Sequence, residues 1–495
     1  MNSYSQILQI VVVSAIYFFL YRFLLNSIGA ELFGIWSLII AFANVPSIIN
    51  LGMSGSTIKY VAKYIALNDK EKILSVIQTA IISIILLFGC FILIIYPIIK
   101  KILYSVIPRE LIDVAFYLLP FGLISFFLRY ISGIFQSALD GFQRFYLRNA
   151  VWIVSATINL ILCILLVPIY GVKGAAYSFL IQNTIMILGN YIFLKKVLPE
   201  LRIFLFKWDI VTFKEMFNYG GNLQLNSFAY IFIDPILKFL LGKFGGISII
   251  AYFEMANKII GQLKMLIISV IQTLVPIISQ LKEKMPEKIN EIYIKCCNIT
   301  SYLSMIMFFL FMIYSPIISR IWIGRYENNF VAFSTLLCFH SFIWNITYCA
   351  EAICLGTGKL KWILIANIKI VLLSIFLGYL LGTFYDGFGI IIAYTIASIV
   401  GSVIKYISFH LMQKIEIDFI LKDNMFNFSL FVLGVIFNLI AVYFQRNYQI
   451  ITRFFIIYSI IFSILMIAYI FIINKKRKEI YILIKNQFLI PLKIK

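Results

Sequence analysis

The sequence predicts an all-α integral membrane protein with about fourteen transmembrane helices. Two bulk observations point to this class: 62% of the 495 residues are hydrophobic and only 13% are charged, whereas soluble domains are about half apolar and a quarter charged. A third is that apolar stretches of about 20 residues, the length needed to cross a bilayer core as a helix, recur along the chain. These stretches lack the strict alternation of transmembrane β-strands.

The fourteen expected spans follow one another with short polar connections. They are 7–28, 33–55, 73–97, 111–137, 148–168, 173–194, 215–241, 247–275, 292–318, 331–355, 361–382, 388–411, 425–443 and 451–473. Pro46, Pro120 and Pro235 fall within spans. Each proline removes a backbone hydrogen bond and can kink its helix.

The net charge of +21 would indicate nucleic-acid binding in a soluble protein. Here the positive-inside rule accounts for it, because placing the N-terminus in the cytoplasm puts most basic residues in the inner loops and the C-terminal tail. An even number of spans then leaves both termini inside. We therefore expect no nucleic-acid partner and, because the first apolar run leads directly into a second span, no cleavable signal peptide.

An internal repeat connects the two halves of the sequence. Arg22 and Lys238 are separated by 216 positions, each is followed by Phe-Leu-Leu, and Gly29 matches Gly245 at the same offset. Two further matches support the repeat: "GFQRFYL" with "GKLKWIL" at an offset of 217, and "YGVKGAAY" with "YDGFGIII" at 215. Three matches at nearly one offset predict a duplicated unit.

The repeat predicts two six-helix lobes, and the rest of the chain divides around them. The expected parts are an N-terminal lobe (1–200), a cytoplasmic linker (201–214), a C-terminal lobe (215–412), two additional helices (425–473) and a basic cytoplasmic tail (474–495). Because each lobe has an even number of spans, the copies run in the same direction. Parallel repeats of this kind are typical of secondary transporters, which hold their cargo between the repeats.

Ten charged residues lie within the spans and are the candidate site residues. The bases are Arg22, Arg129, Lys238, Lys258, Lys264, Lys369 and Lys405, and the acids are Asp234, Glu254 and Glu351. A cation at the middle of a lipid-facing helix costs about 2.5–3.5 kcal/mol, so most of these bases must face water or a partner. The excess of bases predicts an aqueous cavity that binds an anion.

Local pairing is the alternative for some of these residues. Asp234 and Lys238, like Glu254 and Lys258, are spaced i,i+4 and share a helix face. For Arg22 the alternative is that its side chain extends to the outer membrane surface. The three acids are candidates for binding a coupling proton or sodium ion.

The sequence offers no sign of catalytic or metal chemistry. The seven cysteines form no CxxC pair, and His340 and His410 are far apart in the sequence. "CLGTGKL" resembles the end of a P-loop, but Leu360 replaces the required Ser or Thr. We therefore expect neither an enzyme nor a bound cofactor or metal.

Three segments resemble polysaccharide-export flippases of the O-antigen translocase type. They are the Ile-Gly turn before "ELFGIW", then "NLGMSGSTIKYVA", and "YGVKGAAYS". The resemblance implies a fold like that of multidrug and toxin extruders, with two six-helix lobes around a V-shaped cavity. Asn50 departs from the pattern, because relatives often carry an acid before the Leu-Gly.

The resemblance also implies a function. The cargo would be an oligosaccharide linked to undecaprenyl pyrophosphate, moved from the inner to the outer leaflet of the bacterial cytoplasmic membrane. Membrane lipids and the polysaccharide polymerase machinery would be partners. Arg22 and Lys238 would then face each other across the cavity and bind the pyrophosphate. Tyr17 and Trp36 could stack on sugars, although a place in the aromatic belt at the lipid interface is more common.

Three other functions stay open. A cation-coupled multidrug exporter of the same fold should carry acids in its cavity, and the first helix has a base and no acid. A membrane-embedded glycosyltransferase or polymerase would need catalytic acids in large outer loops, and the outer loops are short. Charge alone does not distinguish a flippase for the peptidoglycan precursor.

Overall fold

The predicted spans are helices. The computed structural model describes residues 2–50, 52–201, 207–272, 278, 288–357, 361–416, 419–448 and 460–465, and within these ranges no strand occurs. The last predicted span, 451–473, is described at 460–465, where it is helical. Residues 202–206 of the predicted linker and the predicted tail, 474–495, lie outside the described residues. The expectation of an all-α protein is confirmed.

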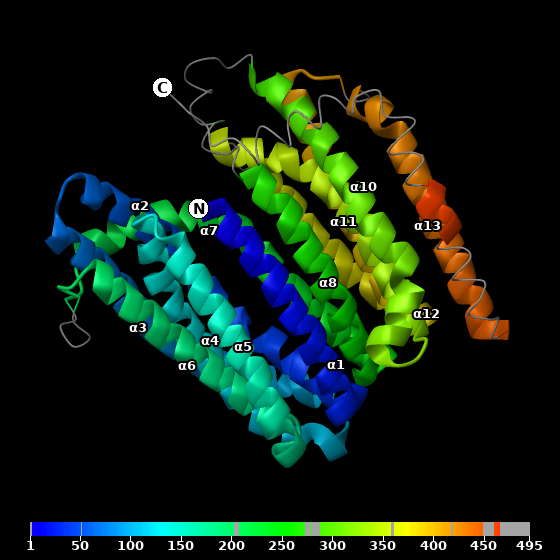
Figure 1. Ribbon diagram of the computed structural model, residues 1–495, viewed down its shortest axis with the longest axis horizontal. Coiled ribbons are helices and arrows are strands. Elements are labelled where there is room, and N and C mark those ends of the chain that lie inside the picture. The colour runs from blue at the N-terminus through cyan, green and yellow to red at the C-terminus, as the bar shows by residue number, and fades with distance from the viewer. Residues whose placement is uncertain are drawn as a thin grey trace. The chain divides into compact units, whose positions relative to one another are not determined.

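Among the described residues, twelve α-helices and two short 3₁₀ helices lie between residues 2 and 448, and residues 460–465 are helical as well (Figure 1). They are α1 (Asn2–Ala43), η1 (Val45–Asn50), α2 (Met53–Ala66), α3 (Lys70–Tyr104), η2 (Arg109–Leu111), α4 (Ile112–Gly141), α5 (Phe145–Tyr170), α6 (Val172–Val197), α7 (Ile210–Gly245), α8 (Ile247–Gln272), α10 (Lys288–Ile323), α11 (Asn328–Thr357), α12 (Lys361–Gln413) and α13 (Phe419–Tyr448).

The helices are long and apolar enough to cross a membrane repeatedly. In the described residues, nine segments meet this condition, and two of them, Ser5–Asn50 and Lys361–Gln413, contain 46 and 53 residues. Non-helical backbone at Gly29 divides α1, and non-helical backbone at Tyr385 and Asp386 divides α12. Helices α7 and α8 are not among the nine. The chain is a multi-pass membrane protein.

The second predicted span, 33–55, is not one continuous helix as expected. Helix α1 ends at Ala43, the 3₁₀ helix η1 follows, and α2 begins at Met53. Pro46 lies in η1 and has no N–H to donate to the α-helical ladder. Gly52 then adopts a left-handed conformation with φ of 71°, which favours glycine because a side chain would be strained there.

The segment before α7 is attached to α3 by hydrogen bonds. The indole N–H of Trp208 donates to the hydroxyl of Ser83 (3.1 Å), and the backbone N–H of Asp209 donates to the hydroxyl of Thr79 (3.2 Å). The Asp209 carboxylate in turn accepts the backbone N–H of Thr212 (3.1 Å) and caps α7. Polar side chains on the otherwise apolar α3 therefore fix where α7 begins.

The chain forms two compact units. Unit 1 comprises residues 1–269 and 359–404, and unit 2 comprises residues 270–358 and 405–495. Within unit 1, α6 packs against α4 and α5, α5 packs against α1, and α2 packs against α4 and α7. The division into two six-helix lobes stays a prediction.

The repeat at an offset of 215 is also present in the backbone of unit 1. Gly171 has φ 57° and ψ −139°, and Asp386, its counterpart, has φ 52° and ψ −139°. One turn later, Gly174 lies so close to the carbonyl of Leu166 that a Cβ would collide with it. Gly389 lies equally close to the carbonyl of Leu381, the counterpart of Leu166. The two copies of the repeat therefore have the same backbone geometry at the turn between their last two helices.

In unit 2, asparagine side chains hold α13 against α10. Asn424 donates to Asn298 (2.9 Å), and Asn438 donates to the carbonyl of Met312 (3.0 Å). Both pairs are separated by 126 residues, as a parallel pair of helices in a fixed register requires. Asn438 also donates to the hydroxyl of Thr335 on α11 (2.7 Å). We call these contacts the asparagine seam; its three helices lie side by side in Figure 1.

Candidate functional site

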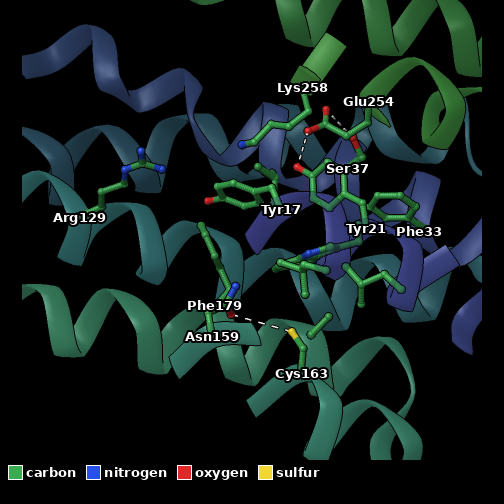
Figure 2. A pocket seen from close by; sticks show the side chains of 15 residues that line it. Tyr17, Tyr21, Phe33, Ser37, Arg129, Asn159, Cys163, Phe179, Glu254 and Lys258 are labelled. Carbon is green, nitrogen blue, oxygen red and sulfur yellow. Dashed lines mark hydrogen bonds between the residues drawn. The ribbon is translucent and has the colours of Figure 1, made fainter. Parts of the chain in front are cut away.

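Unit 1 contains a cavity of about 100 Å³ among α1, α4, α5, α6 and α8 (Figure 2). Its wall combines aromatic rings with a few polar and charged groups. The lining residues are Tyr17, Leu20, Tyr21, Leu24, Phe33, Trp36, Ser37, Ile40, Arg129, Asn159, Cys163, Ala175, Phe179, Glu254 and Lys258. Three of them, Arg129, Glu254 and Lys258, are predicted site residues.

Helix α1 contributes both of its segments to this wall. In the first segment, Tyr17, Tyr21 and Leu24 recur at helical spacing and share one face. The second segment presents Phe33 in the same way. The turn at Gly29, where φ is 78°, brings the second segment back along the first, so that the rings of Tyr21 and Phe33 lie 5.2 Å apart between centroids.

Lys258 extends into the cavity over an aromatic ring. Its ammonium nitrogen lies 3.7 Å from the centroid of the Tyr17 ring, a distance at which the ring quadrupole attracts the cation. The i,i+4 spacing suggested that Lys258 would pair with Glu254 instead. That pairing is not formed, because Glu254 pairs with Lys238 of α7 instead. The Lys258 ammonium therefore has no carboxylate of the described residues in direct contact.

Arg129 supplies a second cation from α4. Its guanidinium carbon lies 5.1 Å from the ring centroid of Trp152 and 5.8 Å from that of Phe126. In Figure 2 the Lys258 ammonium lies over the ring of Tyr17, and Arg129 lies to one side of that ring. The cavity is therefore lined by two cations that rest on aromatic faces, from where their N–H donors can turn to an anion.

Lys238 is buried in a charge cluster beside the cavity. Its side chain is 3% exposed, and its ammonium lies 2.9 Å from the Asp234 carboxylate and 2.7 Å from that of Glu254. Glu254 also accepts hydrogen bonds from the hydroxyls of Tyr21 (2.8 Å) and Ser37 (3.2 Å). The i,i+4 pair of Asp234 and Lys238 is therefore formed, and the geometry corresponds to the pairing alternative for Lys238.

The expected pair of facing cations is not formed. Arg22 is exposed on α1 and is not part of the cavity wall, whereas Lys238 is buried between two carboxylates. The repeat places both residues at equivalent positions, but only Lys238 has acids within reach, one on its own helix and one on the next. Lys238 thus has no open face for an anion.

The remaining predicted site residues lie elsewhere. Lys369 is exposed on α12 and Lys264 is half-buried on α8, and neither contributes to the cavity wall. In unit 2, Lys405 pairs with Glu351 at 2.8 Å, and its side chain is 2% exposed. Glu351 could have paired with several of the predicted bases, and the structure assigns it to Lys405.

The sequence predicts only part of the cavity wall. Tyr21 was not predicted, although its i,i+4 spacing from Tyr17 is a signal of a shared face. Asn159 and Cys163 line the cavity from α5 without any signal in their apolar surroundings. Tyr17 and Trp36, which were considered for sugar stacking, lie in the cavity wall. Among the described residues, no three His, Cys, Asp or Glu side chains are placed to bind a metal ion.

Comparison with solved structures shows a transporter fold. A multidrug resistance transporter of the MATE family, in its inward-facing conformation, matches with a TM-score of 0.68 at 17% identity over 81% of this chain and 96% of that chain. The lipid II flippase MurJ, in its inward closed conformation, matches with a TM-score of 0.67 at 15% identity over 98% of this chain and 99% of that chain. The expected extruder-like fold is confirmed.

Sequence comparison identifies the family. A Shigella flexneri protein described as an O-antigen transporter is 22% identical over 330 residues, which are 64% of this chain and 75% of that protein. These relatives are named as transporters or flippases and not as enzymes, in agreement with the sequence analysis. Residues 20–332, more than half of the chain, match the family described as "Polysaccharide biosynthesis protein". The chain therefore belongs to the polysaccharide biosynthesis protein family of membrane transporters.

Proposed function

We propose that the protein is a flippase that moves an undecaprenyl-pyrophosphate-linked oligosaccharide from the inner to the outer leaflet of the bacterial cytoplasmic membrane. It works by alternating access and supplies the biosynthesis of a surface polysaccharide such as O-antigen, capsule or exopolysaccharide. Both termini lie in the cytoplasm, and the polymerase machinery takes up the delivered repeat unit.

The observation that carries this proposal is the charge of the unit 1 cavity. Lys258 and Arg129 line it with their cations against aromatic rings, and the one acid among its lining residues, Glu254, is in contact with the Lys238 ammonium. Such a wall favours an anionic group over a cationic one. Arginine can bind phosphate through two parallel hydrogen bonds, and lysine acts as a point charge.

The direction of movement agrees with the electrical field across the membrane. An anion that moves outward down an inside-negative potential gains about 2.3 kcal/mol per charge per 100 mV. The diphosphate would cross through the cavity while its polyprenyl tail stays in the lipid. Aromatic side chains such as Tyr17 and Trp36 would contact the first sugar.

The experiment compares cavity cations with an exposed one. In a strain that lacks the gene, wild type, Arg129→Ala, Arg129→Lys, Lys258→Ala and Lys369→Ala are expressed at matched membrane levels, and surface polysaccharide is measured. We expect polysaccharide to be lost in both cavity alanine variants, partly restored by Arg129→Lys and unchanged in Lys369→Ala. Full polysaccharide from both cavity alanine variants would contradict the anion-binding role of the cavity.

Two other outcomes identify other cargoes. If the gene does not affect polysaccharide but protects cells from cationic drugs, the protein is a multidrug exporter. If deleting the gene stops cell-wall synthesis and expressing the wild-type gene restores that synthesis, the cargo is the peptidoglycan precursor. In both cases the transport of the new cargo should be compared between the cavity variants and Lys369→Ala, because the difference shows whether the cavity cations bind that cargo.

A further inference from the structure

The Lys238 ammonium occupies a site built from oxygen atoms of three helices. Asp234 comes from its own helix, α7, and Glu254 from α8, at 2.9 and 2.7 Å. The third oxygen is the backbone carbonyl of Ser37 on α1, which accepts at 3.4 Å. Two carboxylates and a carbonyl around one point are ligands suited to a hard cation.

The site requires a cation for electrostatic reasons. Removing one partner from a buried ion pair strongly destabilises a protein, because the remaining charge has no counter-ion. Here two carboxylates share a single ammonium, so its removal would leave Asp234 and Glu254 facing each other. An ammonium group is about as large as a potassium ion, and the lysine stem keeps it in place permanently.

The site is not fully covered by protein. The Lys238 side chain is 3% exposed, but that of Asp234 is 41% exposed. A small ion could therefore reach the two carboxylates if the lysine did not occupy the space between them.

We infer that Lys238 is a built-in monovalent cation that takes the place of a sodium or potassium ion at the Asp234–Glu254 site. The site accordingly binds no ion from solution in the wild-type protein. When the ammonium is removed, the same oxygen atoms bind sodium or potassium.

The third acid of the spans is occupied in the same way. In unit 2, Glu351 holds the ammonium of Lys405 at 2.8 Å. Each of the three acids that could have bound a coupling ion therefore carries a lysine. If the proposed flippase function holds, movement of the cargo does not depend on sodium at these acids, and the membrane potential acting on the anionic cargo supplies the driving force.

The test measures stability and does not depend on transport. The full chain is purified in detergent micelles as wild type, Lys238→Met, Lys238→Met with Asp234→Asn, and Lys258→Met. Thermal unfolding midpoints are recorded at constant ionic strength and pH while choline, which is too large for the site, is replaced by sodium or potassium. Lys258→Met is the matched control, because it removes a nearby cation and leaves the oxygen site filled.

We expect the midpoint of Lys238→Met to rise by a few degrees with sodium or potassium and to saturate, as binding to the folded state alone requires. The wild type, Lys258→Met and the double variant should show no such rise. The inference is overturned if folded Lys238→Met unfolds at the same temperature in choline, sodium and potassium, or if the wild type responds equally.

A second measurement covers the case in which Lys238→Met does not fold in choline. Extraction is then repeated in sodium and in potassium, with Lys238→Arg as the variant that keeps a tethered cation. Recovery of a monodisperse Lys238→Met protein in either ion supports the inference. Failure in both ions, while Lys238→Arg remains monodisperse, contradicts it, because the vacated site then takes no cation from solution.

Discussion

The phenolic hydroxyl of Tyr21 donates a 2.8 Å hydrogen bond to Glu254, which lies 233 residues further along the chain. This contact joins the first helix to α8 at the point where Glu254 also meets Lys238. The carboxylate is thereby held on two sides, by a neutral donor from α1 and by an ammonium from α7.

Removing this hydroxyl should destabilise the charge cluster. We expect Tyr21→Phe to lower the free energy of unfolding by about 1–2 kcal/mol, since a hydrogen bond to a charged group is lost. Tyr17→Phe is the matched control, because its ring face, and not its hydroxyl, contacts Lys258. Unfolding midpoints in detergent are measured for the two variants. Equal midpoints would show that the hydrogen bond of the Tyr21 hydroxyl does not contribute to the free energy of unfolding.

Two glycines should not accept a side chain. A Cβ on Gly34 would collide with the carbonyl of Ile247, and one on Gly52 would collide with that of Gly220. We expect Gly34→Ala and Gly52→Ala to cost at least about 1–3 kcal/mol, because backbone must move, and Gly52 is also left-handed. Gly89→Ala in α3, where the space around a Cβ is open, should be neutral or stabilising. Size-exclusion profiles of the three variants make the comparison, and a monodisperse Gly34→Ala with an unchanged midpoint would refute the close approach.

The asparagine seam should show direct coupling between its partners. Asn438→Ala removes the donor to Thr335, and Thr335→Val removes the acceptor. A double-mutant cycle on these two changes should give a coupling energy of about 0.5–1.5 kcal/mol, the range found for hydrogen bonds between membrane helices. A coupling energy of zero would mean that the hydrogen bond between Asn438 and Thr335 does not stabilise the contact of α13 with α11.

The start of α7 should depend on pH through Asp209. Its pKa lies below the usual 3.8, first because the Thr212 hydroxyl donates to the carboxylate and then because two backbone N–H groups do. A lowered pKa in the folded state means that this stabilisation is present at neutral pH and is lost as the pH falls through that pKa. The protection of the Val211 and Thr212 amides from hydrogen exchange, taken relative to the intrinsic rate at each pH, should therefore fall in acid more in the wild type than in Asp209→Asn. The same acid response in both proteins would exclude the carboxylate as its source.

The repeated turn, formed by Gly171 in one copy and Asp386 in the other, should be more stable with glycine than with aspartate in either copy. Asp386 has φ 52° and ψ −139°, a region in which a side chain costs about 1–3 kcal/mol. Asp386→Gly should thus raise the free energy of unfolding by about 1 kcal/mol, and Gly171→Asp, the reverse change in the other copy, should lower it. A stabilising effect of Gly171→Asp would contradict this reading of the repeat.

The helices and part of the charge pairing follow from local sequence. Apolar runs of sufficient length predict the spans because every backbone group in lipid must be bonded within its own segment. The pair of Asp234 and Lys238 follows from their spacing on one helix. Pro46 predicts a disturbed helix, although not the length of the interruption.

The rest depends on contacts between distant helices, which local patterns do not encode. Glu254 has the same spacing from Lys258 as Asp234 has from Lys238, yet it bonds Lys238, because packing of α7 on α8 brings that ammonium closer. Lys405 and Glu351 are 54 residues apart, and no periodicity relates them. The cavity wall likewise combines five helices, so its members could be named only in part.

The asparagine seam has a consequence for the synthesis of the chain. Asn298 leaves the ribosome 126 residues before its partner Asn424, an interval of roughly 6–25 s at bacterial rates of about 5–20 residues per second. During this interval α10 is in the membrane with polar side chains that lack their final partners, which is unfavourable in lipid. Helix α13 therefore joins unit 2 late, and a nascent chain that stalls before it exposes a polar stripe that quality-control proteases and insertion chaperones can recognise.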